Sequence, residues 1–322
     1  MVHDPRARFD DTCYGIAMNS GLTRNNIVIL LSAPRSGTTQ LAGMLRSYAK
    51  LNFLGETFHG GKHCISSWSH FHADAKPVIT RAACAILGRP PLNSSEAFRA
   101  IKRDPVKALR IIAESDSSPA TTFAFKVFPG HISLSEFGKI LKAVRCDVIV
   151  VSRSPVDTYI SRLKADKLGI WKKIDTTEIK PNIYEEKFRE YHEDISNYFR
   201  AYYDVARRSA NNVVTLSYDQ IYKSGNPPDQ VVDMMLRDLG LDVGDCATEQ
   251  VLQPQDRTPN RANKVSNWDE FVEGIELMGA SHMLDRIEFR NPISSGDYRK
   301  FLIAKAIRQA VRRITRRNSI SA

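Results

Sequence analysis

Residues 26–39 read NIVILLSAPRSGTT, and this stretch carries the strongest signal for the fold. Asn26–Ser32 is a short apolar run rich in β-branched residues, which is typical of a strand buried on both faces of a sheet. Residues 33–38 indicate a turn, and apolar residues then recur at helical spacing from Thr39 to Tyr48. The stretch therefore predicts a strand, a glycine-containing loop and a helix in succession.

Similar strand patterns recur along the chain, with helix-like segments between them. They are Thr122–Phe128, Asp147–Ser152 and Asn212–Leu216. Because strands that alternate with helices favour a parallel sheet, we expect an α/β fold with a P-loop-type parallel sheet flanked by helices. The aromatic residues from Tyr184 to Arg208 fit one long amphipathic helix with its aromatic face in the core. Leu168–Asn182 lacks clear periodicity and is expected to form a mobile loop beside the site.

The charge distribution argues against a general polyanion-binding protein. The formal net charge of the 322 residues is +10, with 42% hydrophobic and 25% charged residues. Residues 298–322 contain eight Lys and Arg and no acidic residue, so the rest of the chain carries only about +2. We therefore expect no nucleic-acid partner.

Cysteine and histidine usage favours neither a disulfide framework nor a metal site. The five cysteines are scattered and lack paired spacing. His59, His63, His70 and His72 cluster around Cys64, but their spacings match no standard zinc pattern. No apolar run approaches the roughly 20 residues of a membrane-spanning helix, and the first eleven residues are charged where a secretion signal would be apolar. We expect a cytoplasmic protein without a metal ion.

The loop between the first strand and the first helix is suited to hold an anion. Consecutive amides and the positive end of the helix dipole form a cradle, and Gly37 permits close backbone approach. Relative to a nucleotide-hydrolysing P-loop, the loop lysine is missing, and Arg35 offers its cation one turn earlier. No Walker B Asp ends the strand at Ser152, so magnesium is not expected. The expected anion ligands are Arg35, Ser36, Gly37, Thr38 and Thr39.

A second anion site is predicted at the same edge of the sheet. Arg153 follows the strand that ends at Ser152, and Ser161 lies eight residues further on, in a helix that Pro155 can start. Ligands of open parallel sheets bind at the carboxyl ends of the strands. Arg153 and Ser161 can therefore converge on a phosphate beside the first loop.

These two motifs resemble those of the sulfotransferases that use 3′-phosphoadenosine 5′-phosphosulfate (PAPS). In that family the 5′-phosphosulfate loop reads PRSGTT or PKSGTT, which Pro34–Thr39 matches residue for residue, and an Arg with a following Ser forms the 3′-phosphate site. The segment 257–271 more loosely resembles the family's basic loop over the nucleotide, with Arg261 and Lys264 as candidate contacts. The resemblance implies PAPS as co-substrate and transfer of its sulfuryl group to a hydroxyl.

The general base has two main candidates. Glu56 follows the strand-like run Leu51–Leu54, and in this it resembles the catalytic Glu of bacterial carbohydrate sulfotransferases of the nodulation-factor and trehalose type. That resemblance implies a carbohydrate or glycolipid acceptor. His131 follows a later strand that contains Lys126, as does the base of the cytosolic steroid and phenol enzymes. His59, close to Glu56, is a further alternative.

The predicted organisation is an N-terminal extension (1–25), a sulfotransferase domain (26–275) and a C-terminal extension (276–322). An apolar stripe on the last segment indicates a basic amphipathic helix, formed by Ile303, Ile307, Ala310, Val311 and Ile314. This helix can contact an anionic membrane at its inner face, or it can pack on protein. The oligomeric state is left open.

Two other functions remain possible at this point. A P-loop nucleotide kinase would share the strand, loop and helix, but the missing loop lysine counts against it. A non-catalytic anion-binding or membrane-surface protein would use the basic tail, but it leaves Arg153, Ser161 and Glu56 unexplained.

Overall fold

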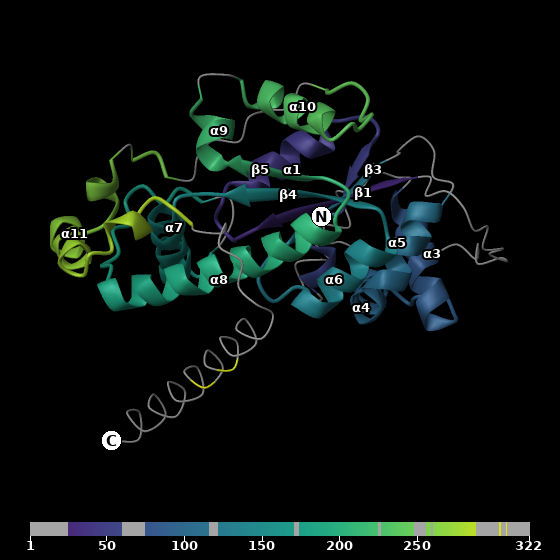
Figure 1. Ribbon diagram of the computed structural model, residues 1–322, viewed down its shortest axis with the longest axis horizontal. Helices are drawn as coiled ribbons and strands as arrows, with labels where there is room; N and C mark the ends of the chain where they lie inside the picture. The colour runs from purple at the N-terminus through teal and green to yellow at the C-terminus, as the bar shows by residue number, and fades with distance from the viewer. Residues whose placement is uncertain are drawn as a thin grey trace, which may run out of the picture.

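The computed structural model describes residues 25–59, 75–115, 122–170, 174–224, 227–247, 256–258 and 260–287, together with Ile303 and Ile307. Within these ranges the centre of the molecule is a parallel five-stranded sheet in the order β2-β3-β1-β4-β5 (Figure 1). The strands are β1 (Asn26–Ser32), β2 (Leu51–Phe53), β3 (Thr122–Val127), β4 (Cys146–Ser152) and β5 (Val213–Ser217). The predicted α/β fold is confirmed, and the predicted strand bounds hold to within one residue.

Helices cover both faces of the sheet (Figure 1). The α-helices are α1 (Thr38–Arg46), α3 (Ala75–Leu87), α4 (Ser94–Arg103), α5 (Pro105–Glu114), α6 (Leu134–Ala143), α7 (Pro155–Leu168), α8 (Glu185–Ser209), α9 (Tyr218–Tyr222), α10 (Pro228–Asp238) and α11 (Trp268–Leu277). Short 3-10 helices lie at Thr57–His59 (η1), Arg261–Lys264 (η2) and Ser281–Met283 (η3). The strands thus lie in the middle of a three-layer arrangement.

The residues of β1 alternate between two cores, as expected for a strand buried on both faces. Ile27, Ile29 and Leu31 pack in the larger core with α3 to α8 and α11. Val28 and Leu30 pack in the smaller core with α1, α9 and α10. The unbroken apolar run of β1 is therefore explained by burial from both sides.

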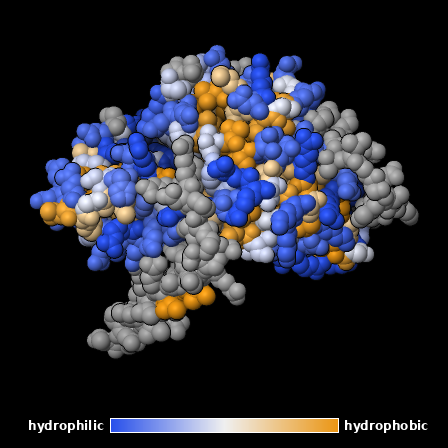
Figure 2. All heavy atoms as spheres, in the orientation of Figure 1, coloured by the Kyte–Doolittle hydropathy of each residue, from blue (hydrophilic) through white to orange (hydrophobic). Residues whose placement is uncertain are grey.

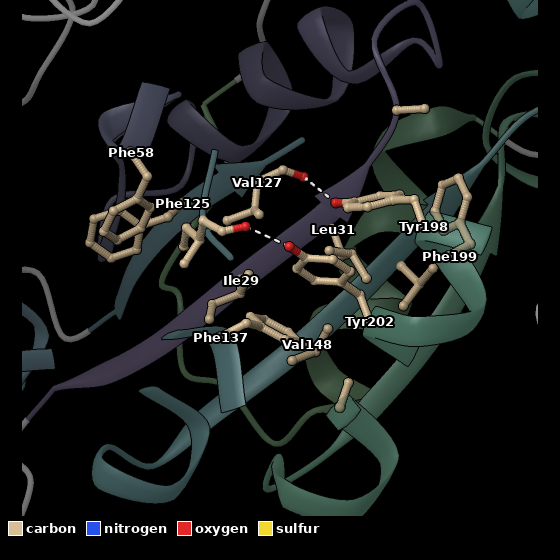
Figure 3. Close-up of a cluster of buried hydrophobic side chains, with 14 of the residues drawn as sticks. Ile29, Leu31, Phe58, Phe125, Val127, Phe137, Val148, Tyr198, Phe199 and Tyr202 are labelled. Carbon is tan, nitrogen blue, oxygen red and sulfur yellow. Dashed lines mark hydrogen bonds between the residues drawn. The ribbon is translucent and has the colours of Figure 1, made fainter. Parts of the chain in front are cut away.

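The aromatic face of α8 packs in the core, as the sequence predicted, and it forms hydrogen bonds to the end of β3 and the loop after it (Figure 3). The ring centres of Tyr198 and Tyr202 lie 4.6 Å apart. Their hydroxyls donate to the carbonyl oxygens of Val127 and Ile132, respectively. Buried phenol groups usually find such partners, and here the partners belong to β3 and the loop after it. This loop contains His131, so α8 fixes the position of a candidate site residue.

The sheet order brings the predicted site residues to one edge. β1 lies between β3 and β4, with Leu31 level with Val127 and Ser32 level with Val151. Because all strands are parallel, the segments that follow β1, β2, β3 and β4 leave the sheet at the same edge. They carry Arg35, Glu56, His131 and Arg153.

Several sequence predictions fall partly outside the described residues. Of the predicted basic helix, only Ile303 and Ile307 are described; both are helical, and they are 54% and 59% exposed (Figure 2). Ala310, Val311 and Ile314 lie outside the described part, as do His63, His70, His72 and Cys64. Within that part no group of three or more His, Cys, Asp or Glu side chains is arranged to hold a metal ion. Nor does any described helix have the length and apolarity needed to cross a membrane.

Candidate active site

The turn after β1 has a backbone that only particular residues can adopt. Gly37 caps the N-terminus of α1 with φ 77° and ψ 4°. A Cβ atom at this position would lie 2.6 Å from Cδ2 of Tyr218, which is closer than real Cβ contacts. Arg35 has φ 73° and is the one non-glycine residue with positive φ in the described ranges. Such strain costs about 1–3 kcal/mol and is typical of binding sites.

The turn offers backbone donors to an external anion. Within the described chain, the amides of residues 36–39 have no hydrogen-bond acceptor, since the first turn of α1 leaves its N–H groups free. Ser36 and Thr38 are buried, whereas Thr39 is exposed. Tyr222 donates its hydroxyl hydrogen to the carbonyl oxygen of Gly37 at 3.3 Å, which fixes the turn from behind. The turn has the donor arrangement of a phosphate or sulfate cradle.

Arg35, Arg153 and Ser161 converge beside this turn, as the sequence predicted. Arg35 Nε donates to Ser161 Oγ at 3.0 Å, and Arg153 Nη1 donates to the carbonyl oxygen of Arg35 at 3.1 Å. Burial, and then the positive charge of Arg153, lower the pKa of Arg35. Two half-buried guanidinium groups therefore repel each other here, and a bound dianion would relieve that repulsion.

The Arg153 side chain is held by an aromatic ring that the sequence did not single out. Its guanidinium carbon lies 4.2 Å from the centre of the Tyr218 ring, a cation–π contact. Its Nε is buried and has no hydrogen-bond acceptor in the described part of the chain. Buried donors without partners are rare in folded proteins, so this N–H group is suited to donate a hydrogen bond to a ligand oxygen.

Arg261 and Lys264, the two residues of segment 257–271 that were predicted to contact the ligand, have different surroundings in the structure. Arg261 donates to Asp157 Oδ2 at 2.9 Å, to Asp285 Oδ1 at 2.7 Å and to Ser154 Oγ at 3.0 Å. Burial lowers the pKa of Arg261, but these carboxylates outweigh burial and raise it. The guanidinium predicted to contact phosphate or sulfate is thus already bound to two carboxylates.

Lys264 differs from Arg261 because its side chain forms no hydrogen bond within the described residues. Burial lowers the pKa of Lys264, and its charge interacts with Asp256, Asp157 and Arg153. Lys264 ends the same short helix as Arg261, which donates to Ser154, the residue after Arg153, so η2 brings Lys264 to the side of the site where Arg153 lies. Of the two predicted contacts, Lys264 is the one available to an anion.

Glu56 lies in a second cluster, at the ends of β2 and β3. Gly55, with φ 61°, turns the chain after β2, and its carbonyl accepts from the amide of Lys126 at 2.8 Å. Glu56 Oε1 then lies 2.9 Å from Lys126 Nζ, and Oε2 lies 3.9 Å from His131 Nε2. The side chains of Glu56 and Lys126 are only 16% and 8% exposed. The structure therefore brings both candidate bases together, with a buried cation beside the carboxylate.

The surroundings of His131 bear on its tautomer and its protonation. The amide of Phe128 donates to His131 Nδ1 at 3.2 Å, so a neutral imidazole carries its hydrogen on Nε2, facing Glu56. Burial lowers the pKa of His131 to about 4, although the Glu56 charge acts in the opposite direction. Burial thus favours a neutral imidazole, whose Nδ1 lone pair accepts the Phe128 amide hydrogen. His59 contacts it edge to face, with ring centres 5.1 Å apart.

With this geometry in place, comparison with known proteins assigns the chain to a family. Residues 25–318 match the family model described as "Sulfotransferase domain". The chain belongs to the sulfotransferase family. The protein is therefore an enzyme that transfers sulfuryl groups, and PAPS is the donor that this family generally uses. The nucleotide kinase and the non-catalytic binding protein are thereby set aside.

Solved structures of other sulfotransferases resemble this one at low sequence identity. The sulfotransferase domain of the Synechococcus PCC 7002 olefin synthase is 16% identical, with 71% of this chain and 78% of that chain covered and a TM-score of 0.39. A sulfotransferase from Alicyclobacillus acidocaldarius is 14% identical, with 81% and 97% covered and a TM-score of 0.41. No curated protein matches this sulfotransferase in sequence.

The residues of this sulfotransferase fit the anionic groups of PAPS. The turn amides that have no partner among the described residues, the repelling guanidinium groups and the buried Nε of Arg153 are each suited to a phosphate or sulfate oxygen. Sequence reasoning missed Tyr218, for which no pattern gave a signal. It also missed Lys164, a lysine four residues after Ile160 on the buried side of α7, and this periodicity could have pointed to it.

Proposed function

We propose that this sulfotransferase moves the sulfuryl group of PAPS to a hydroxyl of a carbohydrate or glycolipid by in-line transfer. The observation that carries the proposal is the meeting, at one sheet edge, of a cationic anion cradle and a buried carboxylate. The cradle is built on Arg35 and Arg153, and the carboxylate is Glu56. A transfer reaction needs both, since one binds the donor and the other accepts the proton of the acceptor hydroxyl.

Donor binding is assigned to the turn and its neighbours. The amides of residues 36–39, Arg35 and the Thr39 hydroxyl would hold the 5′-phosphosulfate, and Arg153 with Ser161 would hold the 3′-phosphate. Lys264 would add a third cation. Arg261 keeps its predicted position in the late segment, but we assign it no ligand contact because Asp157 and Asp285 already bind it.

Glu56 is proposed as the general base. Bound PAPS would supply the sulfuryl group and the phosphate leaving group. As the acceptor oxygen forms its bond to sulfur, the bond from sulfur to the phosphate oxygen breaks, and the hydroxyl proton passes to Glu56. The ion pair with Lys126 fixes the orientation of the Glu56 carboxylate. Cations at the cradle stabilise the charge that develops on the leaving phosphate.

The acceptor class is proposed from the nature of the base. A Glu at the end of the second strand resembles the carbohydrate enzymes, whereas a reactive His would resemble the phenol and steroid enzymes. The engaged Nδ1 of His131 supports the first class. Labelled sulfate should pass from PAPS to oligosaccharides or glycolipids in a panel of acceptors. Transfer to phenols and steroids alone would overturn this part of the proposal.

Cellular location is proposed from the cysteines and the tail. Cys146 and Cys246 form no disulfide bond in the part of the chain that the structure describes, which supports a reducing, cytoplasmic compartment. The exposed Ile303 and Ile307 lie four residues apart on the basic tail and support contact with the inner membrane face. Such contact would bring the enzyme close to a lipid-linked acceptor.

A further inference from the structure

Lys164 is a buried charged residue on α7, three residues after Ser161 of the proposed donor site. It is 0% exposed, and lysine is almost never buried to this extent unless it is paired. Its Nζ donates to Asp256 Oδ2 at 2.7 Å and to the carbonyl oxygen of Thr176 at 3.1 Å. It follows Ser161 by three residues, so both side chains project from one side of the helix. A buried charge this close to the site needs a reason.

The two partners of Lys164 belong to segments that also bind each other. Arg257 forms an ion pair with Asp175, and its amide donates to Thr177 Oγ1 at 3.2 Å. Thr177 in turn donates its amide hydrogen to Asp175 Oδ1 at 2.9 Å. Residues 175–177 and 256–258 are thus joined to each other and, through Lys164, to α7. We call this set of contacts the Lys164 clasp.

Arg261 forms a second contact between α7 and the segment that follows Asp256. Arg261 binds Asp157, which lies seven residues before Lys164 and therefore about two turns away along α7. In Figure 1 this part of the chain, coloured yellow-green, lies beside α7. Lys264 ends the same short helix η2, and Arg261 at its start also donates to Ser154, the residue that follows Arg153. The ion pairs Lys164–Asp256 and Arg261–Asp157 therefore hold the segment that carries Lys264.

We infer that Lys164 is a positioning residue for donor binding, which acts through Asp256 to hold Lys264 at the 3′-phosphate site. Separating a buried ammonium from its carboxylate is costly, so the clasp resists opening before the donor arrives. A segment that is ordered in advance loses less conformational entropy when the ligand binds. Lys164 itself touches no donor atom in this account. The inference rests on the proposed PAPS site.

The clasp can be tested without any ligand. Lys164→Met removes the charge and keeps most of the side-chain volume, and Lys167→Met is the matched control because Lys167 is exposed one turn later. Hydrogen exchange should rise together in residues 174–183, 256–258 and 260–264 of Lys164→Met and stay unchanged in Lys167→Met. Unchanged exchange in either segment of Lys164→Met would overturn the clasp.

The link to the donor is tested with 3′-phosphoadenosine 5′-phosphate (PAP) and 5′-AMP. Lys164→Met should weaken PAP binding roughly tenfold or more, which is the effect of losing one charge-assisted contact, and weaken 5′-AMP binding much less. Lys264→Ala should then cost far less in the Lys164→Met background than in the wild type. Equal losses for both nucleotides, or fully additive losses, would overturn the positioning role.

Misfolding of Lys164→Met and absence of PAP binding by the wild type are distinguished as follows. If Lys164→Met fails to fold, Asp256→Asn breaks the same pair from its 20% exposed side, and the same two measurements apply. If the wild-type protein binds no PAP, the proposed function fails. The exchange measurement still decides whether the clasp exists.

Discussion

Replacing Glu56 with Gln removes the proposed base while keeping the shape of the side chain. A general base contributes about 10²- to 10⁴-fold, so we expect turnover to fall at least about a hundredfold. Donor binding should be unchanged, because the cradle around Arg35 does not include Glu56. Turnover is measured with saturating PAPS and acceptor, and PAP affinity is measured by calorimetry.

The same substitution also affects stability, and the structure gives the scale. At 2.9 Å and an effective dielectric constant near 20, the attraction between Glu56 and Lys126 is about 6 kcal/mol before desolvation is subtracted. Removing one partner of such a buried pair typically costs about 3–5 kcal/mol. Urea unfolding should therefore show a clear loss in the free energy of unfolding of Glu56→Gln.

A second variant separates chemistry from stability. Adding Lys126→Met to Glu56→Gln removes the ammonium group that has lost its carboxylate, so stability should recover in part while turnover stays low. Glu276→Gln, at an exposed position on α11, is the control and should change neither quantity. Wild-type turnover in Glu56→Gln, or a collapse of turnover in His131→Ala alone, would refute the assignment of the base.

Four other predictions follow from the same geometry. Gly37→Ala should lose more stability than Gly240→Ala in urea unfolding, because both have positive φ but only Gly37 also meets Tyr218; equal losses would contradict this. Arg153→Ala should weaken PAP binding more than 5′-AMP binding in calorimetry, and equal weakening would mean that Arg153 does not contact the 3′-phosphate. Because burial lowers the pKa of His131 to about 4, the unfolded chain binds the extra proton between about pH 6.5 and 4; stability should fall by about 3 kcal/mol as pH drops through this window, and less in His131→Ala. Full-length protein should co-sediment with anionic vesicles at low salt, whereas a protein truncated after Asp297 should not; equal sedimentation would exclude the tail as the membrane contact.

The sequence predicted the elements around the site because each has a local cause. A run of apolar β-branched residues indicated β1, and Gly37 indicated the turn, where contact with Tyr218 leaves no space for a side chain. The convergence of Arg35, Arg153 and Ser161 followed from parallel strands that end at one edge. These features depend on neighbours in the chain or on the topology of the sheet.

The contacts that hold the site could not be predicted in the same way. Lys164 and Asp256 are 92 residues apart, and Arg261 and Asp157 are 104 residues apart. Charged residues in surface loops look alike in sequence whether they bind a ligand, solvent or each other. Arg261 was therefore predicted to contact the ligand, although two carboxylates bind it in the folded chain.

The binding of PAP, compared with that of 5′-AMP and of ATP with magnesium, tests the donor site directly when it is measured by calorimetry on the full-length protein. The two guanidinium groups, the turn amides that no described residue binds and the buried Nε of Arg153 predict that PAP binds most tightly and that magnesium has no effect on its affinity. Equal affinity for PAP and 5′-AMP, or tighter binding of ATP with magnesium, would contradict the proposed donor site.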